Sequence, residues 1–106
     1  MKIKVPDSIL IGLHSYEVIF NPHLQIDEER VGTLNRRTQT LEIENALAQS
    51  QKEVTLWHEI IHGISGNFSL ALSEKDTDNL AIGIVQFLQD NFGIEFDFSD
   101  IPVKEE

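Results

Sequence analysis

Two histidines and a glutamate near the middle of the chain have the types and spacing of a metal-dependent hydrolytic site. His58 and His62 belong to the sequence H-E-x-x-H, and on a helix two residues four apart project from one face, one turn apart. Neutral imidazole is a good zinc ligand, and a catalytic zinc site uses three protein ligands and a water. Glu59 lies roughly 100° further round such a helix, within reach of a metal-bound water. The pattern therefore predicts a metal site with Glu59 as general base.

This geometry requires a helix, and the residues around the motif favour one. Ser50 and Glu53 have the spacing of a capping box, directly ahead of an apolar run that starts at Val54. The large apolar residues of that run, Trp57 included, fill one arc of a helical wheel, and the two histidines lie beside the arc. We expect a helix that ends near Gly66 and buries one broad side, with the histidines at the margin of the core. The alternative is a buried helix whose histidines are placed incidentally.

Two histidines leave a zinc site one protein ligand short, and a second predicted helix offers carboxylates. This helix should span residues 73 to 91, because Ser73 opens a capping box and Gly93 is a typical stop. Glu74 and Asp78 share one of its faces. The short preceding loop predicts an antiparallel helix hairpin, which brings Glu74 beside His62. Alternatively, Glu74 only interacts with the helix dipole.

These residues resemble a known family. H-E-x-x-H followed by E-x-x-x-D is similar to the gluzincin zinc metallopeptidases, and the short chain is most similar to the minimal phage and prophage zincins of ImmA/IrrE type. The resemblance implies that His58, His62 and Glu74 bind zinc and that Glu59 is the base. It also implies that Asp78 orients His58 without itself binding the metal.

The chain departs from the larger relatives at one catalytic position. No residue matches the histidine or tyrosine with which they stabilise the developing oxyanion. His14, Tyr16 and His23 are the N-terminal candidates for that role, and each is better explained as a surface or packing residue.

Composition limits the function further. The chain has 106 residues, of which 41% are hydrophobic and 25% charged, as expected for one domain spanning residues 1–106. A formal net charge of −10 argues against a nucleic-acid partner, and no apolar run has transmembrane length. The absence of cysteine excludes disulfides and thiolate zinc sites. These features predict a cytoplasmic protein, and they leave the oligomeric state open.

The remaining residues predict an α+β fold in which a small, mostly antiparallel sheet packs on a two-helix zinc-binding core, as in zincins. Alternating or β-branched runs indicate three or four main strands, with a short helical turn over residues 24–29 and a solvated tail over residues 102–106. The expected extended segments are residues 1–5, 9–11, 16–20, 31–34, 39–44 and 94–98. The pair Arg36-Arg37 is expected in the solvated turn of a hairpin.

Residues 40–44 precede the metal helix, where gluzincins carry the strand that borders the cleft. If this strand lies at the sheet edge, an extended peptide can pair with its backbone. Glu42 and Glu44 would then face solvent beside the peptide and disfavour acidic segments. The alternative is a strand interior to the sheet.

The expected function is therefore a small zinc-dependent metallopeptidase that acts on a protein or peptide. Glu59 would take the proton of a zinc-bound water and pass it to the leaving amine. The alternative function is a zincin-like regulatory or protein-binding module that keeps the metal without proteolysis. A third possibility is a chain that binds no metal.

Overall fold

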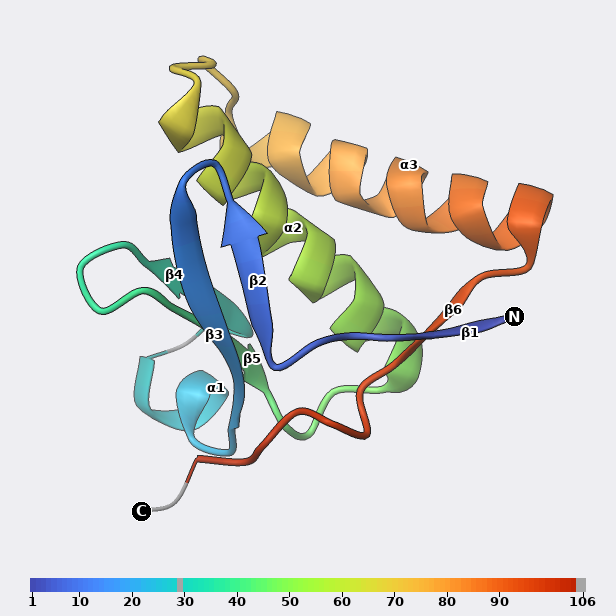
Figure 1. Cartoon of the computed structure of the whole chain (residues 1–106), viewed down its shortest axis with the longest axis horizontal. Helices are drawn as coiled ribbons and strands as arrows, with labels where there is room; N and C mark the ends of the chain where they lie inside the picture. The colour runs from blue at the N-terminus through green and yellow to red at the C-terminus, as the bar shows by residue number, and fades with distance from the viewer. Residues whose placement is uncertain (29, 105–106) are drawn as a thin grey trace.

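A four-stranded sheet and two long helices organise the chain (Figure 1). The computed structural model describes residues 1–28 and 30–104. The strands are β2 (Ser8–Ile11), β3 (His14–Asn21), β4 (Gly32–Asn35) and β5 (Thr40–Glu44), in the order β2-β3-β5-β4. The β3–β5 pair is parallel, and the other two pairs are antiparallel. An α+β fold with a mixed, mostly antiparallel sheet is thus confirmed.

The helices are α1 (Leu24–Glu28), α2 (Gln49–Asn67) and α3 (Glu74–Phe92). The predicted helical turn is confirmed as α1, while position 29 of that prediction lies outside the described residues. In Figure 1, α2 lies between the sheet and α3, and it contacts β2, β4 and β5 on one side and α3 on the other. The helix with the H-E-x-x-H motif is therefore held from two sides.

The core lies between the sheet and α2. Alternating residues of the two central strands point to this side, as the period of two requires. They pack with Leu56 of α2, and the segments at both ends of the chain close the cluster. The buried members are Val5, Val18, Phe20, Leu41, Ile43, Leu56, Phe98 and Ile101.

The start of α2 differs from the prediction. The helix begins at Gln49, and the N–H of Ala48 donates to the side chain of Gln51 at 3.4 Å. Because the methyl group of Ala48 accepts nothing, only this half of a capping box exists. Glu53 is buried, and its carboxylate accepts the backbone N–H of Phe96 at 2.8 Å. The predicted Ser50–Glu53 capping box is wrong because Glu53 instead anchors the C-terminal segment.

The caps of α3 agree with the prediction. The Ser73 hydroxyl accepts the N–H of Asp76 at 3.0 Å, and the Asp76 carboxylate faces the N–H of Ser73 at 3.4 Å. At the other end Gly93 has a left-handed φ of 62°, which favours glycine just after a helix. These local signals fix where α3 starts, and so they place Glu74 in its first turn.

Both ends of the chain join the sheet region. β1 (Lys2–Lys4) pairs in parallel with β6 (Glu95–Asp97). After β6 the chain runs along β3. The N–H of Phe20 donates to the carbonyl of Pro102 at 2.9 Å, and the carbonyl of Phe20 accepts the N–H of Lys104 at 2.7 Å. β2 pairs only with residues 14–17 of β3, so the rest of that edge is open to this segment. Residues 102–104 are exposed, as predicted for a solvated tail, but their backbone pairs with β3 instead of lying free; residues 105–106 lie outside the described residues.

The expected edge strand is interior. β5 pairs with β3 on one side and β4 on the other, so its backbone is not open to a peptide. Glu44 is only 2% exposed, and Glu42 is half-buried between Asn21 and Lys104. The docking model for residues 40–44 is therefore wrong, because both edges of β5 are already paired. The side chains expected in solvent are covered by α1 and the C-terminal segment. The edge strand on this side of the sheet is β4.

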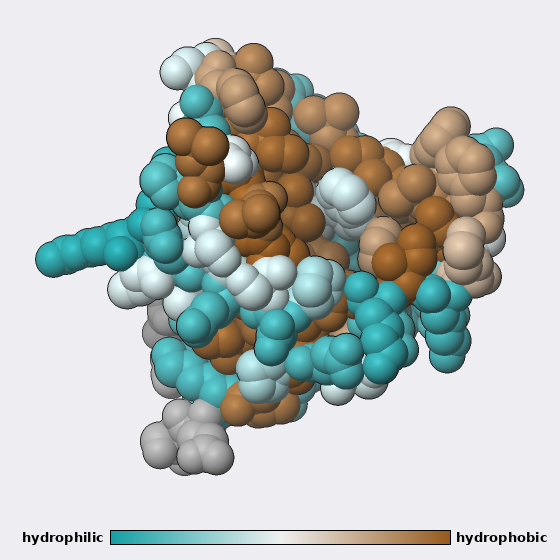
Figure 2. Space-filling view, viewed as in Figure 1, coloured by the Kyte–Doolittle hydropathy of each residue, from teal (hydrophilic) through white to brown (hydrophobic). Residues whose placement is uncertain are grey.

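Large apolar side chains also lie exposed on one face of the molecule. Figure 2 shows them gathered over β2 and the two long helices. Leu10, Leu13, Phe68, Phe87 and Phe92 are all more than half exposed. In the part of the chain that the structure describes, neither long helix has the length of continuous apolar sequence that crossing a bilayer requires.

Candidate metal centre

Three predicted ligands meet where the end of α2 lies beside the start of α3. The Nε2 atoms of His58 and His62 are 3.1 Å apart. A Glu74 oxygen lies 3.2 Å from Nε2 of His58, and the other lies 2.6 Å from Nε2 of His62. One ligand atom from each residue lies within 4.8 Å of the other two. The group could hold a metal ion.

Small residues on α3 make this meeting possible. Thr77 and Ala81 are fully buried where α3 faces α2, so the two helix backbones approach closely. The Thr77 hydroxyl donates to the carbonyl of Ser73 at 3.0 Å, which keeps its polar atom paired in this contact. Glu74 is one turn before Thr77 and so projects towards the histidines at the open end of the interface.

The donor set and its spacing suit a small divalent cation. Tetrahedral ligands about 2.1 Å from zinc lie about 3.4 Å from one another. The separations that involve His58, 3.1 and 3.2 Å, are close to this value, and the 2.6 Å between His62 and Glu74 is shorter. The side chains of His58 and His62 are 15% and 33% exposed, whereas that of Glu74 is 74% exposed. The group is thus buried on the α2 side and open towards solvent at Glu74, which leaves room for a further ligand.

Asp78 contacts the other ring nitrogen of His58. One of its oxygens lies 3.3 Å from Nδ1 of His58, one turn along α3 from Glu74. A carboxylate in this position favours a proton on Nδ1, which leaves the lone pair of Nε2 for a metal. The structure therefore places Asp78 where the sequence analysis expected it.

Glu59 lies beside the ligand group but makes none of its contacts. The residue is 7% exposed, and among the described residues no group donates a hydrogen bond to its carboxylate. Burial raises the pKa of the Glu59 carboxyl, and the nearby histidines lower it by less. A carboxylate with a raised pKa is a stronger proton acceptor than an ordinary one. This environment suits a general base.

Glu59 also lines two adjoining pockets, one on each side. The first has a volume of about 270 Å³ and is bounded by β4, Arg30, Arg36 and His62. The second, of about 340 Å³, is bounded by Arg30, residues of α2 and Asp78. A larger hollow of about 610 Å³ lies across the sheet near Ser8 and Pro102 and contains none of the predicted site residues. The chemistry-bearing groups face the two smaller pockets.

The edge strand β4 forms one wall of the first pocket. Val31 accepts the N–H of Glu44, so residues 31, 33 and 35 form the hydrogen-bonded pairs with β5. The backbone groups of Gly32 and Leu34 therefore point away from β5. A Cβ on Gly32 would lie 3.0 Å from a Glu59 oxygen and 2.5 Å from the Thr55 methyl group. Glycine is needed here for the strand to lie so close to α2.

Sequence reasoning missed three residues of this site. Gly32 carried a usable signal, since a glycine within a strand often marks a close backbone approach. Arg30 and Arg36 carried none, because their position depends on how the hairpin packs on α2. Arg36 is exposed in the hairpin turn, as predicted, but the prediction did not include its contact with α2, where its Nη2 donates to the carbonyl of His62 at 3.0 Å.

The three candidates for oxyanion stabilisation lie elsewhere. None of them lines either pocket beside Glu59. Tyr16 is buried in the sheet, His14 is exposed at the start of β3, and the N–H of His23 donates to Asn21 at 2.9 Å. Their interpretation as surface or packing residues agrees with these positions.

Comparison with protein-family models, with curated proteins and with solved structures finds no significant match to this chain. The inference of function therefore depends on the geometry of His58, His62, Glu74, Asp78 and Glu59.

Proposed function

We propose that the protein is a small zinc-dependent metallopeptidase of the gluzincin type. The observation that carries this proposal is the approach of Glu74 to both histidines of the H-E-x-x-H motif, at 3.2 and 2.6 Å. Glu59 lies next to them, buried and without a hydrogen-bond donor among the described residues. Two imidazoles and a carboxylate form a ligand set found in zinc peptidases, and the adjoining glutamate supplies the base.

Each residue has a defined role in this proposal. His58, His62 and Glu74 hold the zinc, which when bound supplies a Lewis acid that acidifies water and polarises a carbonyl. Glu59 accepts the proton of the attacking water and delivers it to the nitrogen of the leaving amine. Asp78 holds the ring of His58 through Nδ1.

The substrate would lie along β4. The outward backbone groups of Gly32 and Leu34 can pair with an extended peptide, and such pairing makes few demands on side chains. A peptide in this position passes Glu59, because Gly32 lies directly against its carboxylate. This arrangement keeps the peptide-pairing mechanism expected from the sequence but moves it from β5 to the neighbouring strand.

The first test is the metal content of the purified full chain, by elemental analysis before and after chelation. We expect about one zinc per chain, with strong loss of zinc in His58→Ala, His62→Ala and Glu74→Ala, because each variant removes one of three ligands. The fall in zinc should lower thermal stability as well, since metal binding is coupled to folding. Zinc content unchanged in Glu74→Ala would reject the proposed ligand set.

The second test separates catalysis from metal binding. Glu59→Gln keeps the size of the side chain but cannot accept the proton. We expect this variant to retain zinc and to lose peptide hydrolysis. A Gln variant that cuts a peptide at the wild-type rate would contradict the role given to Glu59.

The exposed apolar face favours a second candidate function, a regulatory or protein-binding module of zincin type. Exposed large side chains such as Phe87 and Phe92 are suited to a protein partner (Figure 2). In this alternative the metal stabilises the chain, and a partner is bound without being cut. A partner that binds wild type and Glu59→Gln equally tightly and is cut by neither would support it.

A further inference from the structure

We propose that Arg36 forms a subsite for a carboxylate of the bound peptide, about three residues from the bond that is cut. The inference rests on the proposed peptidase function and adds a substrate class to it, namely peptides with an acidic side chain or a free C-terminus at that distance. Its starting point is charge. The chain has a formal net charge of −10 and three arginines, yet two of these line the pocket beside Glu59 and His62.

Arg36 is held against the metal helix. Its Nη2 donates to the carbonyl of His62 at 3.0 Å, and its guanidinium lies over Gly66, where any Cβ would collide with it. The contact with the carbonyl uses one of five N–H donors, and the rest of the planar fork suits the two oxygens of a carboxylate. Among the side chains that the structure describes, no carboxylate pairs with Arg36. Its charge is therefore available to a ligand.

The packing of β4 on α2 gives the distance from the reaction centre. Gly32 lies against Glu59, Leu34 lies against Gly63, and Arg36 lies against Gly66. From Glu59 to Gly66 the helix rises about 10 Å, at about 1.5 Å per residue. An extended peptide covers this length in roughly three residues, at about 3.3 Å each.

The charges around the two pockets favour an acidic group at Arg36 over one beside the ligand group. The second pocket is bounded by both Arg30 and Asp78, and Glu74 lies on the solvent side of the ligand group, so the charges there are mixed. An acidic peptide residue would meet the carboxylates of Glu74 and Asp78 there, whereas at Arg36, at the other end of the groove, no described carboxylate pairs with the guanidinium. Glu42 and Glu44, which we expected to repel acidic peptides, line neither pocket.

The test measures peptide binding by the full chain, loaded with zinc and carrying Glu59→Gln so that peptides are not cut. The probes are fluorescein-labelled, C-terminally amidated peptides of ten uncharged residues, with one Glu moved along the sequence. Each has a partner with Gln at the same position. We expect the best Glu peptide to bind about three- to tenfold more tightly than its partner, as measured by fluorescence anisotropy.

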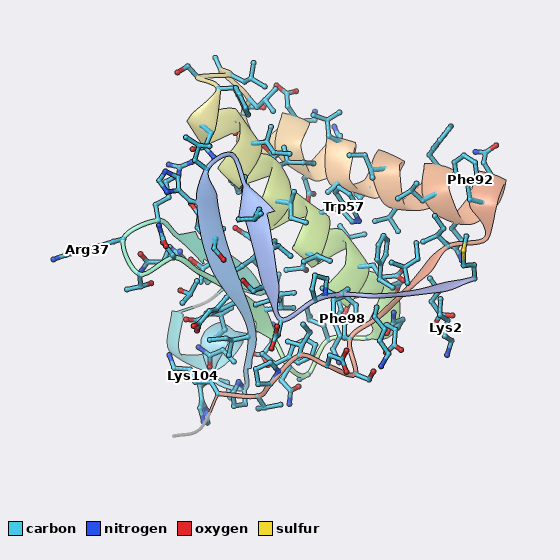
Figure 3. The ribbon with its side chains drawn as sticks, viewed as in Figure 1. Lys2, Arg37, Trp57, Phe92, Phe98 and Lys104 are labelled. Atoms are coloured by element: carbon cyan, nitrogen blue, oxygen red, sulfur yellow. The ribbon has the colours of Figure 1, made fainter. Side chains whose placement is uncertain are left out.

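Matched variants assign the preference to Arg36. Arg36→Gln should reduce the Glu-to-Gln affinity ratio to about one, and Arg36→Lys should restore it only in part, because lysine lacks the planar fork. Arg37→Gln removes the same charge from the next residue, whose side chain extends into solvent away from α2 (Figure 3), and should leave the ratio unchanged. Equal Glu and Gln affinities at every position, equal losses in the two Gln variants, or no binding by any probe would overturn the proposal.

Two further arms identify the source of the carboxylate and separate this inference from the peptidase itself. Peptides without Glu but with a free C-terminus at varied distances test the terminal carboxylate. An Arg36-dependent gain in only one probe set assigns the subsite to that source. Cleavage by the wild-type chain with no acidic preference would reject the subsite and keep the peptidase. Arg36-dependent binding without any cleavage would reject the peptidase and keep the subsite.

Discussion

Replacing Glu44 with glutamine should destabilise the fold strongly, although Glu44 lies outside the metal centre. Its carboxylate is 2% exposed, at the end of β5 where the chain turns towards α2. One oxygen accepts the N–H of Gln25 at 2.9 Å, and the other accepts the N–H of Ala46 at 3.0 Å. Burial raises the pKa of this carboxyl, but the backbone N–H groups outweigh it, and the pKa lies below its ordinary value.

The expected cost follows from these two contacts. In Glu44→Gln one oxygen becomes an amide NH2, which faces a backbone N–H and leaves that donor unpaired. Losing one charge-assisted hydrogen bond and burying an unpaired donor costs about 2–4 kcal/mol in unfolding free energy. This is a large part of the 5–15 kcal/mol typical of a whole domain, and it should lower Tm by at least roughly 10 °C.

The effect should also depend on pH. Because the folded pKa is depressed, the stabilisation by the charge is fully present above the unfolded pKa, at roughly pH 4.3. It is lost as the pH falls through the folded value. The difference between wild type and Glu44→Gln should therefore be largest near neutral pH and shrink below about pH 4.

Urea unfolding followed by circular dichroism, in the presence of a chelator, measures this difference without a metal contribution. Glu42→Gln is the matched control, because Glu42 lies on the same strand. In the wild type the Asn21 side chain donates to the Glu42 carboxylate at 2.7 Å, and the amide oxygen of glutamine can still accept this hydrogen bond. We expect the control to cost under about 1 kcal/mol. Equal losses in the two variants, or a Glu44→Gln loss that does not change with pH, would refute the reasoning.

Three further predictions concern the metal centre and its groove. Asp78→Asn should weaken zinc binding about 10–100-fold in a chelator competition, because it alters the contact with His58; an unchanged affinity would remove Asp78 from the site. Gly32→Ala should retain zinc but lose at least about tenfold in peptide turnover, because its Cβ would displace Glu59; wild-type turnover would contradict this. Gly66→Ala should reduce the Glu-to-Gln peptide ratio, because its Cβ would displace the Arg36 guanidinium; an unchanged ratio would show that the position of the guanidinium over Gly66 is not required.

The parts of the site that the sequence predicted depend on local spacing. His58 and His62 share a face of α2 because four residues make about one helical turn. Glu74 lies beside them because Ser73 caps α3 directly after a short loop. In each case the interaction that fixes the geometry joins residues only a few positions apart, so the local sequence is enough to predict where these side chains lie.

The order of the strands could not be predicted in the same way. Alternation in residues 40–44 shows which side chains share a face, but it contains nothing about which strands lie on either side. β5 became interior through parallel pairing with β3, about 20 residues earlier in the chain. Glu42 is covered by a segment much later in the chain, since Nζ of Lys104 lies 3.8 Å from its carboxylate. Such long-range contacts also placed Arg36 beside α2.

The buried glutamates show where sequence reasoning succeeds and where it fails. Glu44, Glu53 and Glu59 are all under 10% exposed. Glu44 and Glu53 accept backbone N–H groups from distant segments, and no local sequence pattern predicts such contacts. We had predicted that Glu44 faces solvent and that Glu53 caps a helix. These contacts satisfy the two carboxylates and give them structural roles.

Glu59 differs from the other two in lacking such donors among the described residues. Its pKa is raised where that of Glu44 is lowered, because burial is not offset by backbone hydrogen bonds. Instead of backbone donors, Glu59 has the two pockets beside the ligand group, which it lines. In the proposed peptidase this environment suits proton transfer, since a carboxylate already committed to backbone donors would be a poor base. Under that proposal, the residue that the sequence indicated most directly as a base is also the one of the three glutamates without a backbone donor among the described residues.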